Sequence, residues 1–205
     1  MKIKVSCIQT NSFISPTENI NHVNTLIKKA IKKKPDLICL PECVGIFSDD
    51  KKKLNNFCRN ENLFLNFIKD FSKKYKVHFI IGSLPFIKSN KKFLNRSLVI
   101  NNNGQVIAEY DKINLFNVKL NSKEKYLESK LYDSGKKIKV VSLPWGKLGL
   151  SICYDIRFPN LYKKLAKNGA DFLSIPAAFT KTTGKAHWHS LIRSRAIENG
   201  CFVFA

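Results

Sequence analysis

Three residues with complementary reactive side chains each follow an apolar, strand-like segment of the sequence. Glu42 comes after DLICLP, Lys112 after QVIAEYD and Cys153 after KLGLSI. A thiol at neutral pH needs a neighbouring base or cation to become a thiolate. An ammonium group can stabilise that anion and an oxyanion formed later. If the fold brings these side chains together, they form a site for nucleophilic catalysis by a cysteine.

The segment SICYDIRFP (151–159) places Cys153 at a sharp change from strand to helix. A nucleophile at such a turn is exposed and lies close to free backbone N–H groups. From these features alone, a buried structural cysteine remains the alternative to an active-site thiol.

The elements that must position these residues alternate along the chain. Apolar patterning predicts strands at 3–9, 36–40, 77–82, 95–101, 105–110, 147–153, 171–175 and 201–204, and helices at 19–33, 61–76, 158–168 and 186–198. The run NNNG (101–104) predicts a hairpin, and the polar, lysine-rich residues 117–137 predict a surface loop with one helical turn. We expect an α/β domain with a mixed sheet, in which ligands gather beyond the carboxyl ends of the strands.

The net charge of +21 raises the question of a nucleic-acid partner. Arginine, which bidentate recognition of bases and phosphates favours, accounts for only five of the 36 basic residues, and the lysines are spread along the whole chain. We interpret the charge as a compositional bias on solvated faces and expect no nucleic-acid partner. A lysine-driven nucleic-acid binder remains an alternative.

The sequence also predicts no membrane span, no metal and a cytoplasmic location. No apolar run approaches the roughly 18–20 residues that cross a bilayer, and the N-terminus lacks the pattern of a secretory signal. The six cysteines contain no CxxC pair, and the four histidines are not spaced with them as zinc ligands. We expect no disulfide framework.

Four segments together resemble a known family. They are LPE (40–42), YDKINLF (110–116), GLSICYDIRFPNLY (149–162) and PAAFTKTTGKAHWHSLIRSRAIENG (176–200). Their order and spacing are similar to those of the nitrilase superfamily of carbon–nitrogen hydrolases, in particular the branch with omega-amidase and deaminated-glutathione amidase. The resemblance implies a four-layer α-β-β-α sandwich, a homodimer paired through helices, no cofactor, and hydrolysis of a small linear amide by water.

The resemblance also implies roles for individual residues. Glu42 is implied as the base, Lys112 as the charge stabiliser and Cys153 as the nucleophile that forms a thioester, with Glu128 as a second carboxylate. Ammonia and a carboxylic acid are the implied products.

Residues next to this set are expected to contact the substrate or to support the site. Tyr154, Phe179 and Thr180 are the expected substrate contacts, and Arg157 is expected in a structural ion pair. Asn114 departs from the histidine that the branch often carries two residues after the lysine, which leaves substrate details open.

The chain stops at Ala205 inside an apolar run, so we expect one carbon–nitrogen hydrolase domain over 1–205 that is incomplete at its C-terminus. One alternative is therefore an inactive fragment that acts as a structural or interaction module. A different activity of the superfamily, that of an aliphatic amidase, a carbamoylase or a nitrilase, is also compatible with these motifs.

Overall fold

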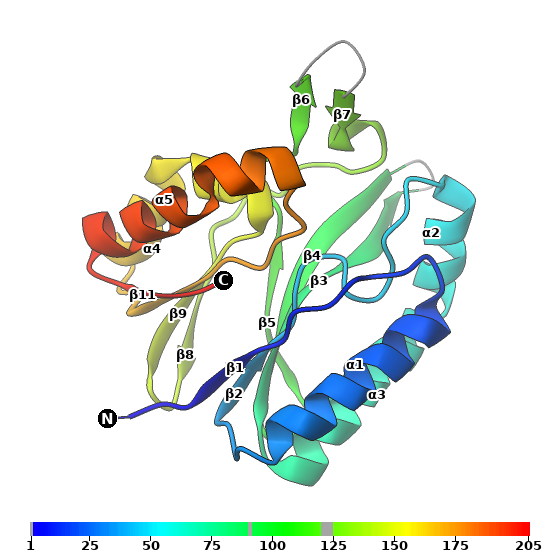
Figure 1. Cartoon of the computed structure of the whole chain (residues 1–205), viewed down its shortest axis with the longest axis horizontal. Coiled ribbons are helices and arrows are strands. Elements are labelled where there is room, and N and C mark those ends of the chain that lie inside the picture. The colour runs from blue at the N-terminus through cyan, green and yellow to red at the C-terminus, as the bar shows by residue number, and fades with distance from the viewer. Residues whose placement is uncertain (1, 90–91, 120–124) are drawn as a thin grey trace.

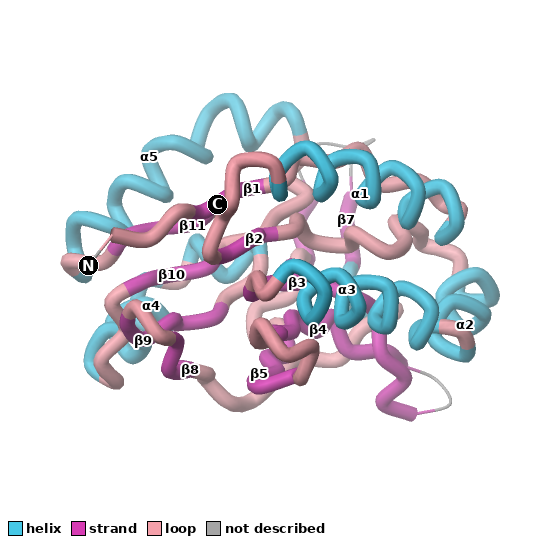
Figure 2. The backbone as a smooth tube through the Cα atoms, turned by 90° about the horizontal axis from the view of Figure 1, so that it is seen from below, coloured by secondary structure: helices cyan, strands magenta, loops and turns pink. Residues whose placement is uncertain are grey.

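Two β-sheets face each other across the centre of the molecule, and helices cover the outer side of each sheet (Figure 1). The computed structural model describes residues 2–89, 92–119 and 125–205. The layers follow the order helix, sheet, sheet, helix, which confirms the predicted α-β-β-α sandwich (Figure 2).

The first sheet has the order β1-β2-β3-β4-β5. Its strands are β1 (Val5–Cys7), β2 (Leu37–Cys39), β3 (His78–Ser89), β4 (Lys92–Ile100) and β5 (Val106–Asp111). The first three strands are parallel, and β3, β4 and β5 are antiparallel neighbours. The helices α1 (Pro16–Ile31), α2 (Lys51–Arg59) and α3 (Glu61–Tyr75) belong to this half.

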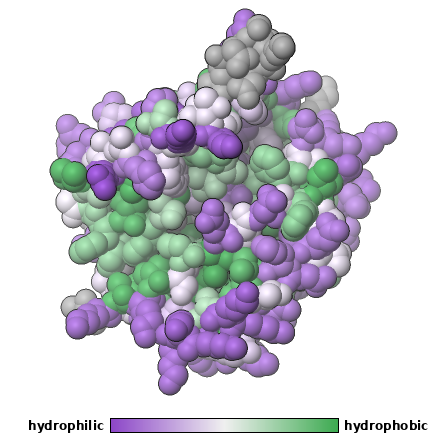
Figure 3. Space-filling view, viewed as in Figure 1, coloured by the Kyte–Doolittle hydropathy of each residue, from purple (hydrophilic) through white to green (hydrophobic). Residues whose placement is uncertain are grey.

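The second sheet has the order β11-β10-β9-β8. Its strands are β8 (Val140–Leu143), β9 (Gly146–Leu150), β10 (Phe172–Ser174) and β11 (Phe202–Phe204), and its helices are α4 (Pro159–Lys167) and α5 (Lys181–Asn199). A short 3₁₀ helix, Cys153–Arg157, lies between β9 and α4. Apolar side chains gather on the face that carries β11, where Phe202 is largely exposed (Figure 3).

Three apolar clusters separate the four layers. Ile27 of α1 and Ile68 of α3 pack on the outer side of the first sheet, and Leu165 of α4 packs on the outer side of the second. The middle cluster joins the sheets, since it contains Val99 of β4 and Leu150 of β9. Burial of each such side chain stabilises the fold by roughly 1.5–3 kcal/mol relative to exposure, so the central cluster fixes the position of one sheet against the other.

Local sequence signals explain where several elements begin and end. The Ser15 side chain accepts the N–H of Glu18 and caps α1, and Gly200 ends α5 in the left-handed conformation. In the predicted hairpin, Gly104 has φ +76° and Asn101 bonds across the turn to Gln105. The β4–β5 hairpin is therefore confirmed.

The prediction of a loop with one helical turn over 117–137 is partly wrong. Asn117–Lys119 (β6) and Lys125–Leu127 (β7) pair as antiparallel strands, whereas Glu128–Lys130 forms a 3₁₀ turn, as predicted; the residues between β6 and β7 lie outside the described chain. Each of these strands is only three residues long, too short to show the apolar alternation that patterning detects. None of the described helices combines the length and apolar character needed to cross a membrane.

Candidate active site

Glu42 lies three residues beyond the end of β2, where the chain presses against β3. A Cβ atom at Gly82 of β3 would fall 2.2 Å from the carbonyl oxygens of Leu40 and Pro41, so only glycine permits this approach. The N–H of Cys43 donates to the Ser83 hydroxyl at 2.9 Å. The backbone on both sides of Glu42 is thus held against the neighbouring strand.

Lys112 lies directly after β5 and is held in a similar way. Its backbone N–H donates to the Asn95 carbonyl oxygen at 2.9 Å, and its carbonyl accepts the N–H of Gly135 at 2.8 Å. A Cβ atom at Gly135 would fall 2.1 Å from the Asp111 oxygen. Lys112 is 2% exposed, so its ammonium group is removed from water and needs anionic partners.

Those partners are two carboxylates. The Lys112 Nζ atom donates to Glu42 Oε1 at 2.9 Å and to Glu128 Oε2 at 2.9 Å. The Asn95 Nδ2 group donates to Glu42 Oε1 and to Glu128 Oε1, both at 3.0 Å. The N–H of Phe116 completes the set by donating to Glu128 Oε2 at 2.7 Å. We call Glu42, Asn95, Lys112 and Glu128 the charged cluster.

Cys153 reaches the charged cluster from the second sheet. It begins the 3₁₀ helix after β9 with φ +49°, a strained conformation for a residue with a side chain. Its N–H donates to the Pro176 carbonyl at 2.8 Å, and its thiol lies close enough to the Glu42 carboxylate for that charge to raise the pKa of the thiol. The expectation of an exposed nucleophile is wrong, because Cys153 is only 8% exposed.

The turn at Cys153 is supported from below by a buried carboxylate. Asp155 Oδ2 accepts the Tyr110 hydroxyl at 2.7 Å and the N–H of Ile152 at 2.9 Å. Its Oδ1 accepts the backbone N–H of Asn114 at 2.9 Å and the side-chain amide at 2.8 Å. Asn114 therefore links the segment after β5 to the nucleophile turn.

Burial and charge act in opposite directions on the ionisable groups. Burial is the largest single influence on Glu42 and disfavours its ionised form, but the attraction of Lys112 and the hydrogen bonds to the carboxylate together outweigh it and lower the pKa of that carboxyl. Burial likewise opposes the charge of Lys112, yet Glu42 and the other nearby anions raise its pKa well above the usual value. For Cys153, burial and then the charge of Glu42 raise the thiol pKa well above the usual value. At neutral pH the site holds a carboxylate, an ammonium and a protonated thiol.

The backbone N–H of Tyr154 is available to a ligand. Within the described residues it donates to no acceptor. Tyr154 follows Cys153 directly in the chain. From this position a backbone donor can stabilise the oxyanion that forms on a substrate carbonyl when the sulfur attacks it.

Aromatic rings and one cation lie beside Cys153. Tyr154 meets Phe116 edge to face at a centroid distance of 5.1 Å. The Arg157 guanidinium lies over the rings of Tyr154 and Phe179 at 5.9 and 5.5 Å, and its Nη2 lies 3.3 Å from His187 Nδ1. The expected ion pair of Arg157 is wrong: within the described part of the chain, no carboxylate lies at ion-pair distance from it.

Thr180 has a role in the backbone. It is the N-cap of α5, and its hydroxyl contacts that of Thr183 at 2.7 Å. Phe179, directly before it, packs against Trp188 at a centroid distance of 4.7 Å. The expected substrate contacts of Tyr154, Phe179 and Thr180 stay predictions.

The structure brings Glu42, Lys112 and Cys153 together, as their positions after strands predict, and Glu128 joins them, as the resemblance implies. Sequence reasoning missed Asn95, which lies inside β4 between Leu94 and Arg96. Its signal was a polar side chain on the same strand face as the buried Val99. No group of described His, Cys, Asp or Glu side chains is arranged to hold a metal ion.

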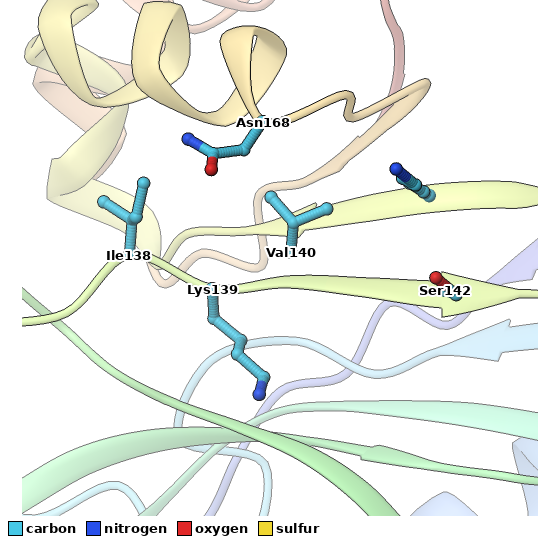
Figure 4. A pocket seen from close by; sticks show the side chains of 6 residues that line it. Ile138, Lys139, Val140, Ser142 and Asn168 are labelled. Carbon is cyan, nitrogen blue, oxygen red and sulfur yellow. The ribbon is translucent and has the colours of Figure 1, made fainter.

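The open cavities of the surface lie elsewhere. One of about 330 Å³ lies beside β8 and β9 (Figure 4). It is lined by Ile138, Lys139, Val140, Ser142, Lys147 and Asn168. These residues include neither a cysteine nor a carboxylate, so this cavity offers no comparable chemistry.

The chain is similar to known proteins over nearly its whole length. The family model described as carbon-nitrogen hydrolase matches residues 4–205. The chain is 37% identical over 204 residues to a deaminated glutathione amidase of Synechocystis sp., covering 98% of this chain and 75% of the relative. It is 32% identical over 210 residues to the omega-amidase NIT3 of Saccharomyces cerevisiae, covering 98% and 72%.

A solved structure shares the fold. The crystal structure of the Caenorhabditis elegans NitFhit protein superimposes with a TM-score of 0.90 at 33% identity, covering 98% of this chain and 50% of that one. The similarity extends over both sheets and their outer helices, since nearly the whole chain is aligned.

Proposed function

The chain belongs to the carbon–nitrogen hydrolase family, and on that premise we propose that it hydrolyses a small linear amide through Glu42, Lys112 and Cys153. The observation that carries the proposal is the contact of one buried ammonium with two carboxylates, one of which lies beside the thiol and raises its pKa. This arrangement supplies a base, a nucleophile and a fixed positive charge at one point.

The reaction begins with attack of sulfur on the carbonyl carbon. Glu42 takes the thiol proton as the S–C bond forms, because the raised thiol pKa keeps Cys153 protonated until then. The carbonyl oxygen becomes an oxyanion, held by Lys112 Nζ and the N–H of Tyr154. Glu42 returns the proton to the nitrogen, the C–N bond breaks, and ammonia leaves a thioester on Cys153.

Water completes the cycle. Glu42 removes a proton from water, and the resulting hydroxide attacks the thioester carbon. The carboxylic acid product leaves as the proton returns to the sulfur. Glu128 orients the ammonium and is itself held in place, because Lys112, Asn95 and the N–H of Phe116 all donate to it.

We assign the substrate to amides that carry a carboxylate at their far end, as the names of the amidase relatives suggest. Arg157 supports this assignment, since its guanidinium lies over Tyr154, next to the nucleophile, without a carboxylate partner in the described chain. A substrate carboxylate would supply that partner. Arg157→Ala should raise KM for a carboxylated amide and leave KM for a neutral amide of equal length unchanged.

The direct test of the activity is ammonia release from a panel of small amides. The wild type should release ammonia and accumulate a thioester detectable by mass spectrometry, whereas Cys153→Ala should do neither. An active Cys153→Ala enzyme would refute the proposal. Cys58→Ala is a suitable control, because Cys58 is also a buried cysteine, and its thiol donates to the carbonyl oxygen of Pro85, which does not belong to the charged cluster.

We also propose a cytoplasmic homodimer without a nucleic-acid partner. The described cysteines are all free thiols, as in a reducing compartment. Ile197 of α5 is 80% exposed, which suits an interface built on that helix. Light scattering during gel filtration would detect the dimer, and Ile197→Glu should shift it to monomer. Retention on DNA at moderate salt would count against the absence of a nucleic-acid partner.

A further inference from the structure

Asn95 touches every charged member of the cluster, although it is itself neutral. Its Nδ2 group donates to Glu42 Oε1 and Glu128 Oε1, both at 3.0 Å. Its backbone carbonyl oxygen accepts the backbone N–H of Lys112 at 2.9 Å. The residue is 4% exposed and lies within β4, so its position is set by the sheet.

The orientation of the amide follows from its partners. Both groups that face it are carboxylates, which only accept hydrogen bonds. The NH₂ group must therefore point toward them, because the amide oxygen would meet two anions. Its two hydrogens satisfy one carboxylate each, and they leave the Asn95 side chain without freedom to turn.

This contact distinguishes the two oxygens of Glu42. Oε1 accepts both Lys112 Nζ at 2.9 Å and Asn95 Nδ2 at 3.0 Å. Oε2 accepts the N–H of Ala178 at 2.9 Å and retains a lone pair for a proton. The donors on Oε1 thus direct Oε2 toward the second sheet, from which Cys153 comes.

We propose that Asn95 is a positioning residue that orients Glu42 as the base for Cys153 by placing an uncharged double donor between the carboxylates of Glu42 and Glu128. The proposal deepens the proposed function and rests on it. One ammonium alone faces these two carboxylates, which repel each other at such short range. The amide supplies the second pair of donors without adding charge.

The two substitutions that test this role remove different parts of the contact. Asn95→Asp keeps the shape but replaces both N–H donors with a third anion. Asn95→Ala removes the donors without adding charge. Ser97→Ala is the matched control, because Ser97 is a buried residue of the same strand whose hydroxyl donates to Ile81 O at 3.1 Å, outside the cluster.

Steady-state kinetics on a small amide should separate positioning from a merely structural role. We expect kcat to fall by about 10²-fold in both Asn95 variants, as a misplaced catalytic group does, with KM changed little. In Asn95→Asp the acidic limb of kcat/KM should also move to higher pH, because the added anion favours protonation of Glu42. Ser97→Ala should keep the wild-type kcat and pH profile.

A second measurement needs no substrate. The rate at which iodoacetamide alkylates Cys153, followed by mass spectrometry of its peptide, should fall in Asn95→Asp and remain unchanged in Ser97→Ala. If the wild type hydrolyses no amide but this difference is found, the proposed function fails and the role of Asn95 stands.

Three results would overturn the proposal. They are wild-type kcat in a folded Asn95→Ala protein, an unmoved acidic limb in Asn95→Asp, and an equal loss of activity in Ser97→Ala. If Asn95→Asp does not fold, as judged by circular dichroism, then kcat of Asn95→Ala decides.

Discussion

Replacing Lys112 by methionine should destabilise the protein and reverse the pH dependence of its stability. Methionine keeps an unbranched chain of similar length but leaves Glu42 and Glu128 without their ammonium partner. The Glu42 and Glu128 side chains are 5% and 13% exposed, so water compensates little for the lost charge. Activity should disappear as well, because the oxyanion loses its cation.

The size of the effect follows from burial. Removing one partner of a buried ion pair costs about 3–5 kcal/mol, a large fraction of the roughly 5–15 kcal/mol by which domains are stable. For a chain of this length we expect Tm to fall by about 6–20 °C at pH 8. Lys88→Met, which removes an ion pair to Asp133 whose side chains are 42% and 38% exposed, should cost only about 0–1 kcal/mol.

The direction of the pH effect depends on which state binds more protons. In the wild type the pKa of Glu42 is lowered, so its contribution is present above its ordinary pKa and is lost as the pH falls through the folded value. In Lys112→Met, burial without the ammonium raises the carboxyl pKa in the folded state. Stability of the variant should then increase as the pH falls from 8 toward 5.5, by up to about 1.4 kcal/mol per pH unit for each proton taken up.

Urea unfolding followed by circular dichroism at pH 8, 7, 6 and 5.5 measures this dependence. The reasoning is refuted if Lys112→Met is as stable as Lys88→Met at pH 8. It is equally refuted if the difference in unfolding free energy between Lys112→Met and wild type does not shrink as the pH is lowered.

Three further predictions follow from single contacts. Gly82→Ala should inactivate the enzyme and lower Tm, because the new Cβ meets the Pro41 oxygen at 2.2 Å; unchanged activity would contradict the close approach. Asp155→Asn should lower the free energy of unfolding in urea by about 2–4 kcal/mol. The Asp155 carboxylate accepts four hydrogen bonds, and the NH₂ group of an asparagine there would face donors in place of acceptors. The pKa of Cys7 is lowered to about 7, chiefly by a hydrogen bond with Cys39, so maleimide should label Cys7 before the other thiols at pH 7.5 and much more slowly at pH 6. Preferential labelling of another cysteine would contradict this.

The reactive residues could be predicted from the sequence, whereas the residue that positions them could not. Glu42, Lys112 and Cys153 each follow an apolar strand, and strand ends in an α/β fold converge on common edges. Asn95 could not be found in this way, because it lies inside a strand. Its role depends on hydrogen bonds to Glu42 and Glu128, which lie far from it in the sequence.

Elements stabilised by tertiary contacts were also missed. Helix α2 opens with three lysines and gives no clear apolar period; it depends on the Asp50 cap and on burial of Leu54 and Phe57. Strand β8 is only four residues long and pairs with β9. In such short elements packing outweighs local propensity, so their patterns carry little information.

The distribution of the site over two sheets explains why so many of its hydrogen bonds cross between them. The charged cluster comes from the first sheet and the segment after it, whereas Cys153 and Ala178 come from the second. The N–H of Ala178 donates to Glu42, and Asp155 below the nucleophile accepts from Tyr110 of β5. The distance from the Cys153 sulfur to the Glu42 carboxylate is therefore set by how the two sheets pack. The apolar layer between the sheets is as much a requirement of catalysis as the charged cluster.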